Sequence, residues 1–187
     1  LETGGEFAHW LSYHFTRGSA LVMLGRVNET IQNMERGMEL AVQAGDAPEA
    51  VELRANCGYL LAGAYLYHGW PEKALAAANQ SLADSRAVMS HASAARAVAM
   101  LGWAQYHLGD FASADEYNKM ALRMAAPMCN SRLISQIHVN MARVALAQGK
   151  LDESWRQTGQ AIEAGKQKNF KRAIAQAYNT RGDIFRV

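Results

Sequence analysis

The sequence is poor in cysteine, in proline and in charge of either sign. It has two cysteines and three prolines in 187 residues, and only 19% of its residues are charged. Cys57 and Cys129 cannot form a disulfide framework, so we expect a reducing compartment, the cytoplasm, and two buried thiols. With 19 basic and 17 acidic residues, the sequence gives no sign of direct nucleic-acid binding or of an anionic membrane surface.

Long apolar runs and β-strand patterns are also missing. The longest uncharged stretch, residues 55–71, is interrupted by polar residues, glycines and a proline, and is too short to span a bilayer. No segment alternates with the two-residue period of a strand. Half of the residues are hydrophobic, which excludes disorder and suffices for a sizeable core. We set residues 1–6, a polar lead-in with two glycines, aside as disordered or vector-derived.

Patterns that carry chemistry are equally scarce. The six histidines form no H-E-x-x-H motif, and neither cysteine has a second cysteine at metal-binding spacing. Gly102 and Gly109 do not form a phosphate-binding loop, because an internal repeat accounts for both. We therefore expect no catalytic residue, no metal site and no cofactor, and the chain is predicted not to be an enzyme.

What the sequence does contain is an internal repeat. Four glycines, spaced 44, 40 and 40 residues apart, each follow an apolar segment: Gly25, Gly69, Gly109 and Gly149. Small residues recur seven residues before these glycines: Gly18, Ala62, Gly102 and Ala142. Small residues recur again five residues after them: Thr30, Ala74, Ala114 and Ser154. Since several columns align at once, we treat the repeat as real.

Each repeat reads as a helix, a glycine turn and a second helix, which we call the A and B helices. Apolar residues follow a helical spacing on both sides of each glycine, Asp110 is a plausible N-cap, and Gly45 and Gly165 are plausible helix stops. We expect helix pairs at 7–24 with 28–44, 50–68 with 71–88, 91–108 with 111–126, and 131–148 with 151–165. The small columns would let paired helices approach closely, with Ala74 against Ala62 or Ala64.

Because a helix pair cannot bury its apolar face alone, the pairs should stack on one another. The predicted fold is all-α: a right-handed α-solenoid of stacked antiparallel helix pairs, with four units plus a partial fifth. It forms a single domain over 7–187, with repeats at about 7–45, 50–88, 91–127, 131–165 and 170–187. The fifth repeat indicates a piece of a longer array or, alternatively, a final helix that caps the stack.

These columns resemble the tetratricopeptide repeat (TPR). The third repeat matches best, in Leu101-Gly102-Trp103-Ala104, in Leu108-Gly109-Asp110-Phe111, and in Ala114 with Ala121-Leu122. The period of 40–44 exceeds the usual 34. It resembles the long repeats of large bacterial signalling ATPases, maltose-type transcription activators, cyclase-linked proteins and some eukaryotic adaptors.

The resemblance implies a peptide-binding concave face lined by the A helices. The family's ligand-facing positions lie thirteen, ten, nine and six residues before each turn glycine. From these positions we select eight candidate binding residues: Asn56, Tyr59, Arg96, Trp103, Gln136, Asn140, Arg143 and Asn179. Asparagine side chains can hydrogen-bond a peptide main chain, and arginine can hold a carboxylate through two hydrogen bonds.

The sequence therefore predicts a non-catalytic scaffold that binds a protein or peptide. We expect it to be the regulatory or interaction part of a larger intracellular signalling or transcription-regulating protein. Two alternatives stay open: a small-molecule effector sensor of such a regulator, and a module that self-associates through the solenoid end. The second is suggested by two apolar residues at that end, Ile184 and Phe185, which a second copy could cover. An enclosed apolar pocket would favour the sensor, and an open polar groove would favour the peptide.

Overall fold

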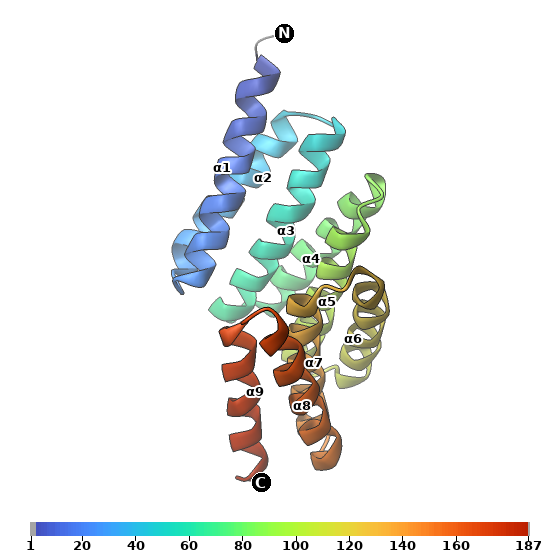
Figure 1. The fold of residues 1–187 in the computed structure, drawn as a ribbon. Coiled ribbons are helices and arrows are strands. Elements are labelled where there is room, and N and C mark those ends of the chain that lie inside the picture. Colours follow the sequence, from blue (N-terminus) through green and yellow to red (C-terminus); the bar gives the residue numbers. More distant parts are fainter. Residues whose placement is uncertain (1–2, 187) are drawn as a thin grey trace. The chain divides into compact units, whose positions relative to one another are not determined.

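The computed structural model describes residues 3–186, with the side chains of 9, 10 and 12–186. Over these residues the secondary structure is helical and contains no strand (Figure 1). The elements are α1 (Thr3–Met23), α2 (Val27–Gln43), α3 (Pro48–His68), α4 (Pro71–Ala87), α5 (His91–Leu108), α6 (Phe111–Ala125), the 3-10 turn η1 (Ala126–Met128), α7 (Ser131–Ala147), α8 (Leu151–Gln167) and α9 (Lys171–Ile184). The all-α prediction is confirmed, and the odd-numbered α-helices are the A helices.

The observed helix bounds follow the predicted ones closely, with one exception at the start. α1 begins at Thr3, four residues before the predicted 7. Gly4 and Gly5 have low helix propensity, which argued for a non-helical lead-in, whereas α1 extends through both. Residues 1 and 2 of that lead-in lie outside the described residues.

The four repeat glycines do close the turns from A to B helices. Gly25, Gly69, Gly109 and Gly149 have φ values of 71°, 86°, 82° and 73°. This left-handed region favours glycine, since a Cβ there would crowd the backbone. A Cβ on any of the four would meet no atom within 4 Å, so backbone conformation rather than lack of space explains the glycine.

A second set of left-handed residues closes the turns from each B helix to the next A helix. Gly45 and three non-glycine residues, Met89, Cys129 and Asn169, have φ values of 75°, 53°, 49° and 50°. Their spacing repeats the 44, 40 and 40 of the turn glycines, although the residue types differ. Gly45 is thus confirmed as a stop. The expectation that both cysteines are buried is wrong for Cys129, which is exposed because it lies in the turn after η1 rather than inside a packed helix.

Gly165 is not a helix stop, contrary to the prediction. It lies inside α8 and is buried. A Cβ on Gly165 would lie 2.8 Å from Ile174 Cγ1 and 3.0 Å from Ser135 Oγ. The glycine is needed because α7 and α9 both approach α8 closely at this point, and the helix runs on to Gln167.

The chain divides into two compact units, an N-terminal unit (Leu1–Ala104) and a C-terminal unit (Gln105–Val187). The division falls within α5, so the third repeat contributes to both units. Each unit is described by itself below. That the two make up one domain over 7–187 stays a prediction.

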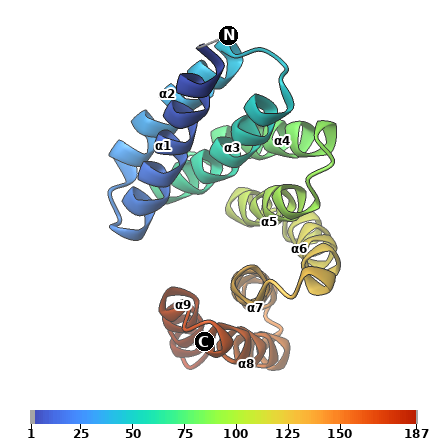
Figure 2. The same ribbon diagram turned by 45° about the horizontal axis from the view of Figure 1, so that its top comes forward.

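In the N-terminal unit, α3 packs against α1, α2 and α4 (Figure 2). The α3–α4 pair is close, because small residues meet there: a Cβ on Gly58 would lie 3.0 Å from Ser81 Cβ. The Ser81 hydroxyl donates to the Ala55 carbonyl at 2.7 Å. Ala62 and Ala74, from the two small columns, are both fully buried.

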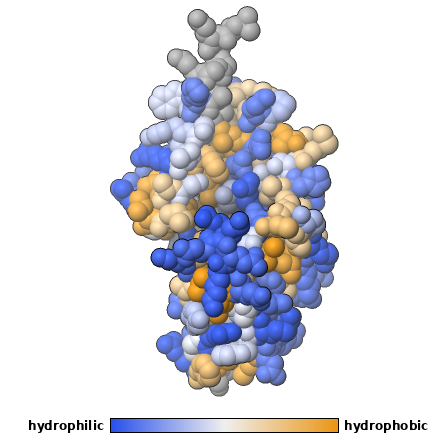
Figure 3. All heavy atoms as spheres, in the orientation of Figure 1, coloured by the Kyte–Doolittle hydropathy of each residue, from blue (hydrophilic) through white to orange (hydrophobic). Residues whose placement is uncertain are grey.

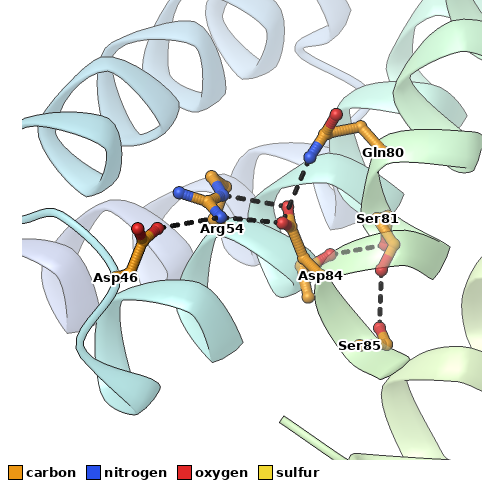
Figure 4. A network of polar contacts seen from close by, with 7 residues as sticks. Asp46, Arg54, Gln80, Ser81, Asp84 and Ser85 are labelled. Carbon is orange, nitrogen blue, oxygen red and sulfur yellow. Dashed lines mark hydrogen bonds and ion pairs between the residues drawn. The ribbon is translucent and has the colours of Figure 1, made fainter. Parts of the chain in front are cut away.

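A buried ion pair also joins α3 to α4 (Figure 4). Arg54 donates to both carboxylate oxygens of Asp84, from Nε at 3.0 Å and from Nη2 at 2.9 Å. Gln80 donates to the same carboxylate at 3.1 Å, and the exposed Asp46 lies 4.0 Å from Arg54 Nη2. The hydrogen bond with Asp84 raises the pKa of Arg54, more than burial lowers it.

In the C-terminal unit, α7 packs against α6, α8 and α9. The predicted crossing of small columns is visible here, since Ser154 Oγ donates to the Ala142 carbonyl at 2.8 Å. Ser135 Oγ donates to the Ala161 carbonyl at 2.7 Å. Side chains of α7, α8 and α9 form an apolar core in this unit. It consists of Val139, Ala161, Ile162, Ala173 and Ala177, with Phe170 packed against it.

The described residues contain neither a candidate membrane-spanning helix nor a candidate metal-binding group. No helix among them combines the length and the apolar character that crossing a bilayer requires. No group of three or more histidine, cysteine, aspartate or glutamate side chains in this part of the chain could hold a metal ion.

Candidate functional site

The eight predicted binding residues all lie on A helices. α3 carries Asn56 and Tyr59, α5 carries Arg96 and Trp103, α7 carries Gln136, Asn140 and Arg143, and α9 carries Asn179. The first four belong to the N-terminal unit and the last four to the C-terminal unit. The two sets are therefore considered separately.

Three of the N-terminal four come together around Arg96. Arg96 Nη2 donates to Asn56 Oδ1 at 2.9 Å, and its guanidinium carbon lies 4.8 Å from the centre of the Tyr59 ring. Ser93 completes the group: its Oγ lies 3.1 Å from Asn56 Oδ1 and 3.0 Å from Arg96 Nη2. We call Asn56, Tyr59, Ser93 and Arg96 the Arg96 cluster.

The charge of Arg96 is not paired within the described residues. No carboxylate lies within 4.0 Å of its guanidinium there, in contrast to Arg54, which is paired with Asp84. The Nε of Arg96 is buried and has no hydrogen-bond partner. Burial raises the pKa of Tyr59, and the Arg96 charge and hydrogen bond offset part of that rise. The cluster thus holds the half-buried guanidinium of Arg96 in a fixed position, and no carboxylate of the described residues neutralises its charge.

Such a site can bind a carboxylate. A guanidinium presents its N–H groups in a rigid fork that matches the two oxygens of a carboxylate. Asn56, Ser93 and the Tyr59 ring fix the position of the fork in advance, so little side-chain entropy is lost when an anion binds. Ser93, sixteen residues before the turn glycine, was missed because no family position pointed to it.

Trp103 does not join the Arg96 cluster. Its side chain is only 5% exposed, and its ring packs edge-on against Tyr67 with centroids 5.0 Å apart. The structure thus places Trp103 in the packed interior rather than on an open surface. An aromatic ring buried edge-on beside a tyrosine is normal packing for a residue of this size.

In the C-terminal unit, Asn140 is the most deeply buried of the four predicted residues. It is 2% exposed, and its Oδ1 accepts a long hydrogen bond of 3.3 Å from Gln136 Nε2. Its Nδ2 is buried and has no hydrogen-bond partner. A buried amide donor without an acceptor costs free energy, roughly 1–3 kcal/mol, unless a ligand or water satisfies it.

No hydrogen bond joins Arg143 or Asn179 to that pair within the part of the chain that the structure describes. Arg143 is half-buried on α7. Burial lowers the pKa of His107, and the charge of Arg143 adds to that shift. Asn179 is exposed on α9. The C-terminal four therefore form one contact, Gln136 with Asn140, rather than a cluster.

Each unit also contains a cavity away from these residues. In the N-terminal unit, a groove of about 610 Å³ that is widely open to solvent is lined by Glu35, Met38, Glu39, Val42, Gln43 and Leu61. In the C-terminal unit, a cavity of about 230 Å³ lies among α6, α7 and α8, and half of its lining residues are charged: Asp115, Lys119, Lys150, Glu153 and Arg156. Neither is the enclosed apolar pocket that a small-molecule sensor would need.

Comparison with known proteins supports the repeat architecture. No protein-family model and no curated protein matches the chain. Among solved structures, the apo form of RapI is similar over 95% of this chain, with a TM-score of 0.75 and 15% identity. The chain spans 63% of the length of RapI.

Two further solved structures are similar to the chain. The TPR-like repeats of a putative kinesin light chain from Podosopora anserina match 92% of the chain and 87% of their own length, with a TM-score of 0.61 and 18% identity. BtubC from P. vanneervenii matches 96% of this chain and 85% of its own, with a TM-score of 0.55 and 15% identity. At these identities the likeness concerns the fold, and it establishes that the chain has the fold of a TPR-like helical repeat protein, an α-solenoid.

Proposed function

We propose that the chain is a non-catalytic scaffold that binds a protein or peptide through its A helices. In this proposal it serves as the regulatory or interaction part of a larger cytoplasmic signalling or transcription-regulating protein. The observation that carries the proposal is the Arg96 cluster, where a guanidinium with no carboxylate partner in the described part of the chain is held by Asn56 and Ser93 against Tyr59. The ligand chemistry that fits is a peptide carboxylate, from an acidic side chain or a free C-terminus.

Binding at an arginine fixed in this way should be strong enough to measure. A hydrogen bond to a charged group contributes about 1.5–3 kcal/mol, which corresponds to roughly tenfold or more in affinity. Tyr59 adds a rigid aromatic surface beside the charge, of the kind that is enriched at binding hot spots. In the second unit, the buried Nδ2 of Asn140 offers a donor for a main-chain carbonyl.

The experiment is a selection of peptides from a random library that displays free C-termini. We expect the selected peptides to carry an acidic residue or to require the free C-terminal carboxylate. Their affinity for Arg96→Met should be about tenfold lower. Methionine keeps much of the length of the side chain and removes the charge, and Ser93 can still bond Asn56.

The matched control is Arg86→Met, the same change at an exposed arginine on α4. It should leave peptide affinity and thermal unfolding as in the unaltered chain. Selected peptides that bind Arg96→Met as well as the unaltered chain would contradict the carboxylate site. Selection of no peptide, together with saturable binding of a small metabolite in either cavity, would favour the sensor instead.

A further inference from the structure

The open groove of about 610 Å³ in the N-terminal unit combines apolar and acidic side chains, and we call it the α2 groove. Its apolar residues on α2, Met38 and Val42, are one helical turn apart, and so are its two acids, Glu35 and Glu39. Residues four apart lie on the same helix face, so an apolar stripe and an acidic stripe run side by side along α2. Leu61 of α3 borders the apolar stripe.

The repeat does not require the exposed valine of this groove. Val42 is 61% exposed and lies seventeen residues after its turn glycine. At the same count the later repeats have Arg86, Ala126 and Lys166, all exposed. Because an alanine or a long basic side chain serves equally well there, packing within the hairpins does not explain the valine.

The α2 groove is open because of helices inside the chain, and residues beyond either end have no bearing on it. α2 contacts the A helix of its own hairpin, α1, and the A helix of the next, α3. α8 likewise contacts α7 and α9, and α3 contacts both helices of the hairpin before it. By the same rule, a further hairpin ahead of α1 would pack against α1, whereas the groove lies on α2 and α3.

Neither carboxylate of the groove is firmly paired. Tyr65 Oη donates to Glu35 Oε1 at 2.8 Å, and no lysine or arginine of the described residues forms an ion pair with Glu35. Burial raises the pKa of Tyr65 to about 12, and the hydrogen bond and charge of Glu35 contribute, so Tyr65 remains a donor at neutral pH. Glu39 pairs with Arg36 at 2.8 Å, but these side chains are 60% and 58% exposed, so the pair contributes little.

The groove lies in the most acidic part of the chain. Residues 27–52 contain six acidic side chains and one basic, a net charge of −5, whereas the whole chain has +2. Much of the compensating positive charge belongs to the other unit, where residues 166–186 contain six basic side chains and one acidic. Figure 3 shows hydrophilic residues gathered over the turn from α8 to α9, where Lys166, Lys168 and Lys171 lie.

We infer that the α2 groove is the docking site for a basic amphipathic helix of a partner protein. A helix laid along α2 repeats the four-residue spacing of both stripes. Its apolar side chains cover Met38, Val42 and Leu61, and its lysine or arginine side chains pair with Glu35 and Glu39. The same carboxylates repel nucleic acid and anionic membranes. None of the residues of the Arg96 cluster lines the groove, so this site is independent of the proposed peptide-carboxylate site.

The probe is a labelled synthetic peptide of about 18 residues with leucine at every third or fourth position and lysine elsewhere. Its C-terminus is amidated, so that it offers no carboxylate to Arg96. The control peptide has the same composition in an order that forms no apolar face. Fluorescence anisotropy should show saturable binding of the probe with a Kd below about 100 μM, weakened by added salt, and at least about tenfold weaker binding of the control.

A lysine in the apolar stripe locates the binding. Val42→Lys places a like charge against the probe at an exposed position, so affinity should fall at least about tenfold while the melting temperature stays within about 2 °C. The matched control is Ala126→Lys, which adds the same charge at the same count from the turn glycine of the third repeat. It should leave the affinity for the probe unchanged.

Removal of the two carboxylates tests the acidic stripe. In Glu35→Gln with Glu39→Gln, the amide oxygen at position 35 can still accept from Tyr65, so the fold should be kept. Binding should weaken several-fold, with a smaller dependence on salt. Glu116→Gln with Glu163→Gln removes the same charge from exposed positions of α6 and α8. That control variant should bind the probe as the unaltered chain does.

Arg96→Met should bind the probe as the unaltered chain does, which separates this test from that of the proposed function. Four results would overturn the inference. The unaltered chain could fail to bind the probe, or could bind the control peptide equally well. Val42→Lys and the double glutamine variant could both bind the probe undiminished. Sedimentation could show a dimer that Val42→Lys converts to a monomer, in which case the occupant is a second copy of this chain.

Discussion

The hairpins α3–α4 and α7–α8 have the same backbone plan but hold their helices together with different chemistry. In α3–α4, Ser81 of the B helix donates to Ala55 of the A helix. In α7–α8 the hydroxyl comes from the opposite helix, since Ser135 of the A helix donates to Ala161. The repeat therefore fixes which positions touch and leaves open which helix supplies the donor.

The two hairpins differ more strongly at the end away from the glycine turn, in the pair of residues that joins the A helix to the B helix. In α3–α4 the Arg54–Asp84 ion pair joins the helices. Counted from the turn glycine, the same positions in α7–α8 hold Ile134 and Ala164. A buried ion pair and an apolar pair thus occupy equivalent places, as expected if desolvation of the two charges offsets most of their attraction.

The largest effect should come from breaking that ion pair on one side only. Asp84→Ala leaves Arg54, whose side chain is 16% exposed, without its carboxylate. We expect the free energy of unfolding to fall by about 3 kcal/mol or more, measured by urea denaturation.

Replacing both residues by those of α7–α8 tests the comparison itself. The double variant Arg54→Ile with Asp84→Ala should unfold within about 1 kcal/mol of the unaltered chain, because no buried charge is left unpaired. If the double variant is as unstable as Asp84→Ala alone, the ion pair has a structural role that the apolar pair cannot fill.

A smaller effect is expected from removing the two serine hydroxyls. Ser81→Ala and Ser135→Ala each delete one buried hydrogen bond to a carbonyl and keep the Cβ, so each should cost about 1 kcal/mol. The two losses, measured by urea denaturation, should agree within about 0.5 kcal/mol. A loss at one hairpin only would mean that the two bonds are not equivalent.

The smallest effect should come from His138, a buried histidine of α7–α8 at a position where α3–α4 has Gly58. Burial lowers the pKa of His138, and its bond to Gln157 offsets part of that shift. The unfolded chain therefore takes up a proton more readily, so stability is full above the ordinary histidine pKa of 6.5 and falls as pH drops below it. Burial, with the charge of Arg143, lowers the pKa of His107 and adds to this loss.

Comparing unfolding midpoints at about pH 7.5 and about pH 5 checks this sign. His138→Gln should lose less stability between the two values than the unaltered chain. An equal loss would show that His138 does not contribute. The α3–α4 hairpin has Gly58 at the equivalent position and should contribute no such dependence.

Much of the fold could be predicted from sequence because its signals are local. The turn glycines repeat with one residue type, and Asp110 caps α6 by accepting from the Ser113 amide at 3.0 Å, as predicted. The second set of turns repeats just as regularly in backbone conformation, yet Met89, Cys129 and Asn169 share no chemistry that a sequence column would reveal. Gly165 was misread because its reason, contact with Ile174 and Ser135, lies in other helices.

The candidate site was predictable only in part. Asn56, Tyr59 and Arg96 were chosen from their positions relative to the turn glycines. In the structure, Arg96 contacts both of the others. Register could not show that Trp103 packs against Tyr67 or that Ser93 joins Arg96. Those contacts depend on rotamers and on helices from neighbouring repeats, which spacing along the chain does not specify.

The most direct measurement is a crystal structure of the chain bound to a peptide selected as described above. We predict a peptide carboxylate within hydrogen-bonding distance of the Arg96 guanidinium, with the peptide against Tyr59 and Asn56. The account would be contradicted by a peptide that contacts only B helices, with no peptide carboxylate bound to the Arg96 guanidinium.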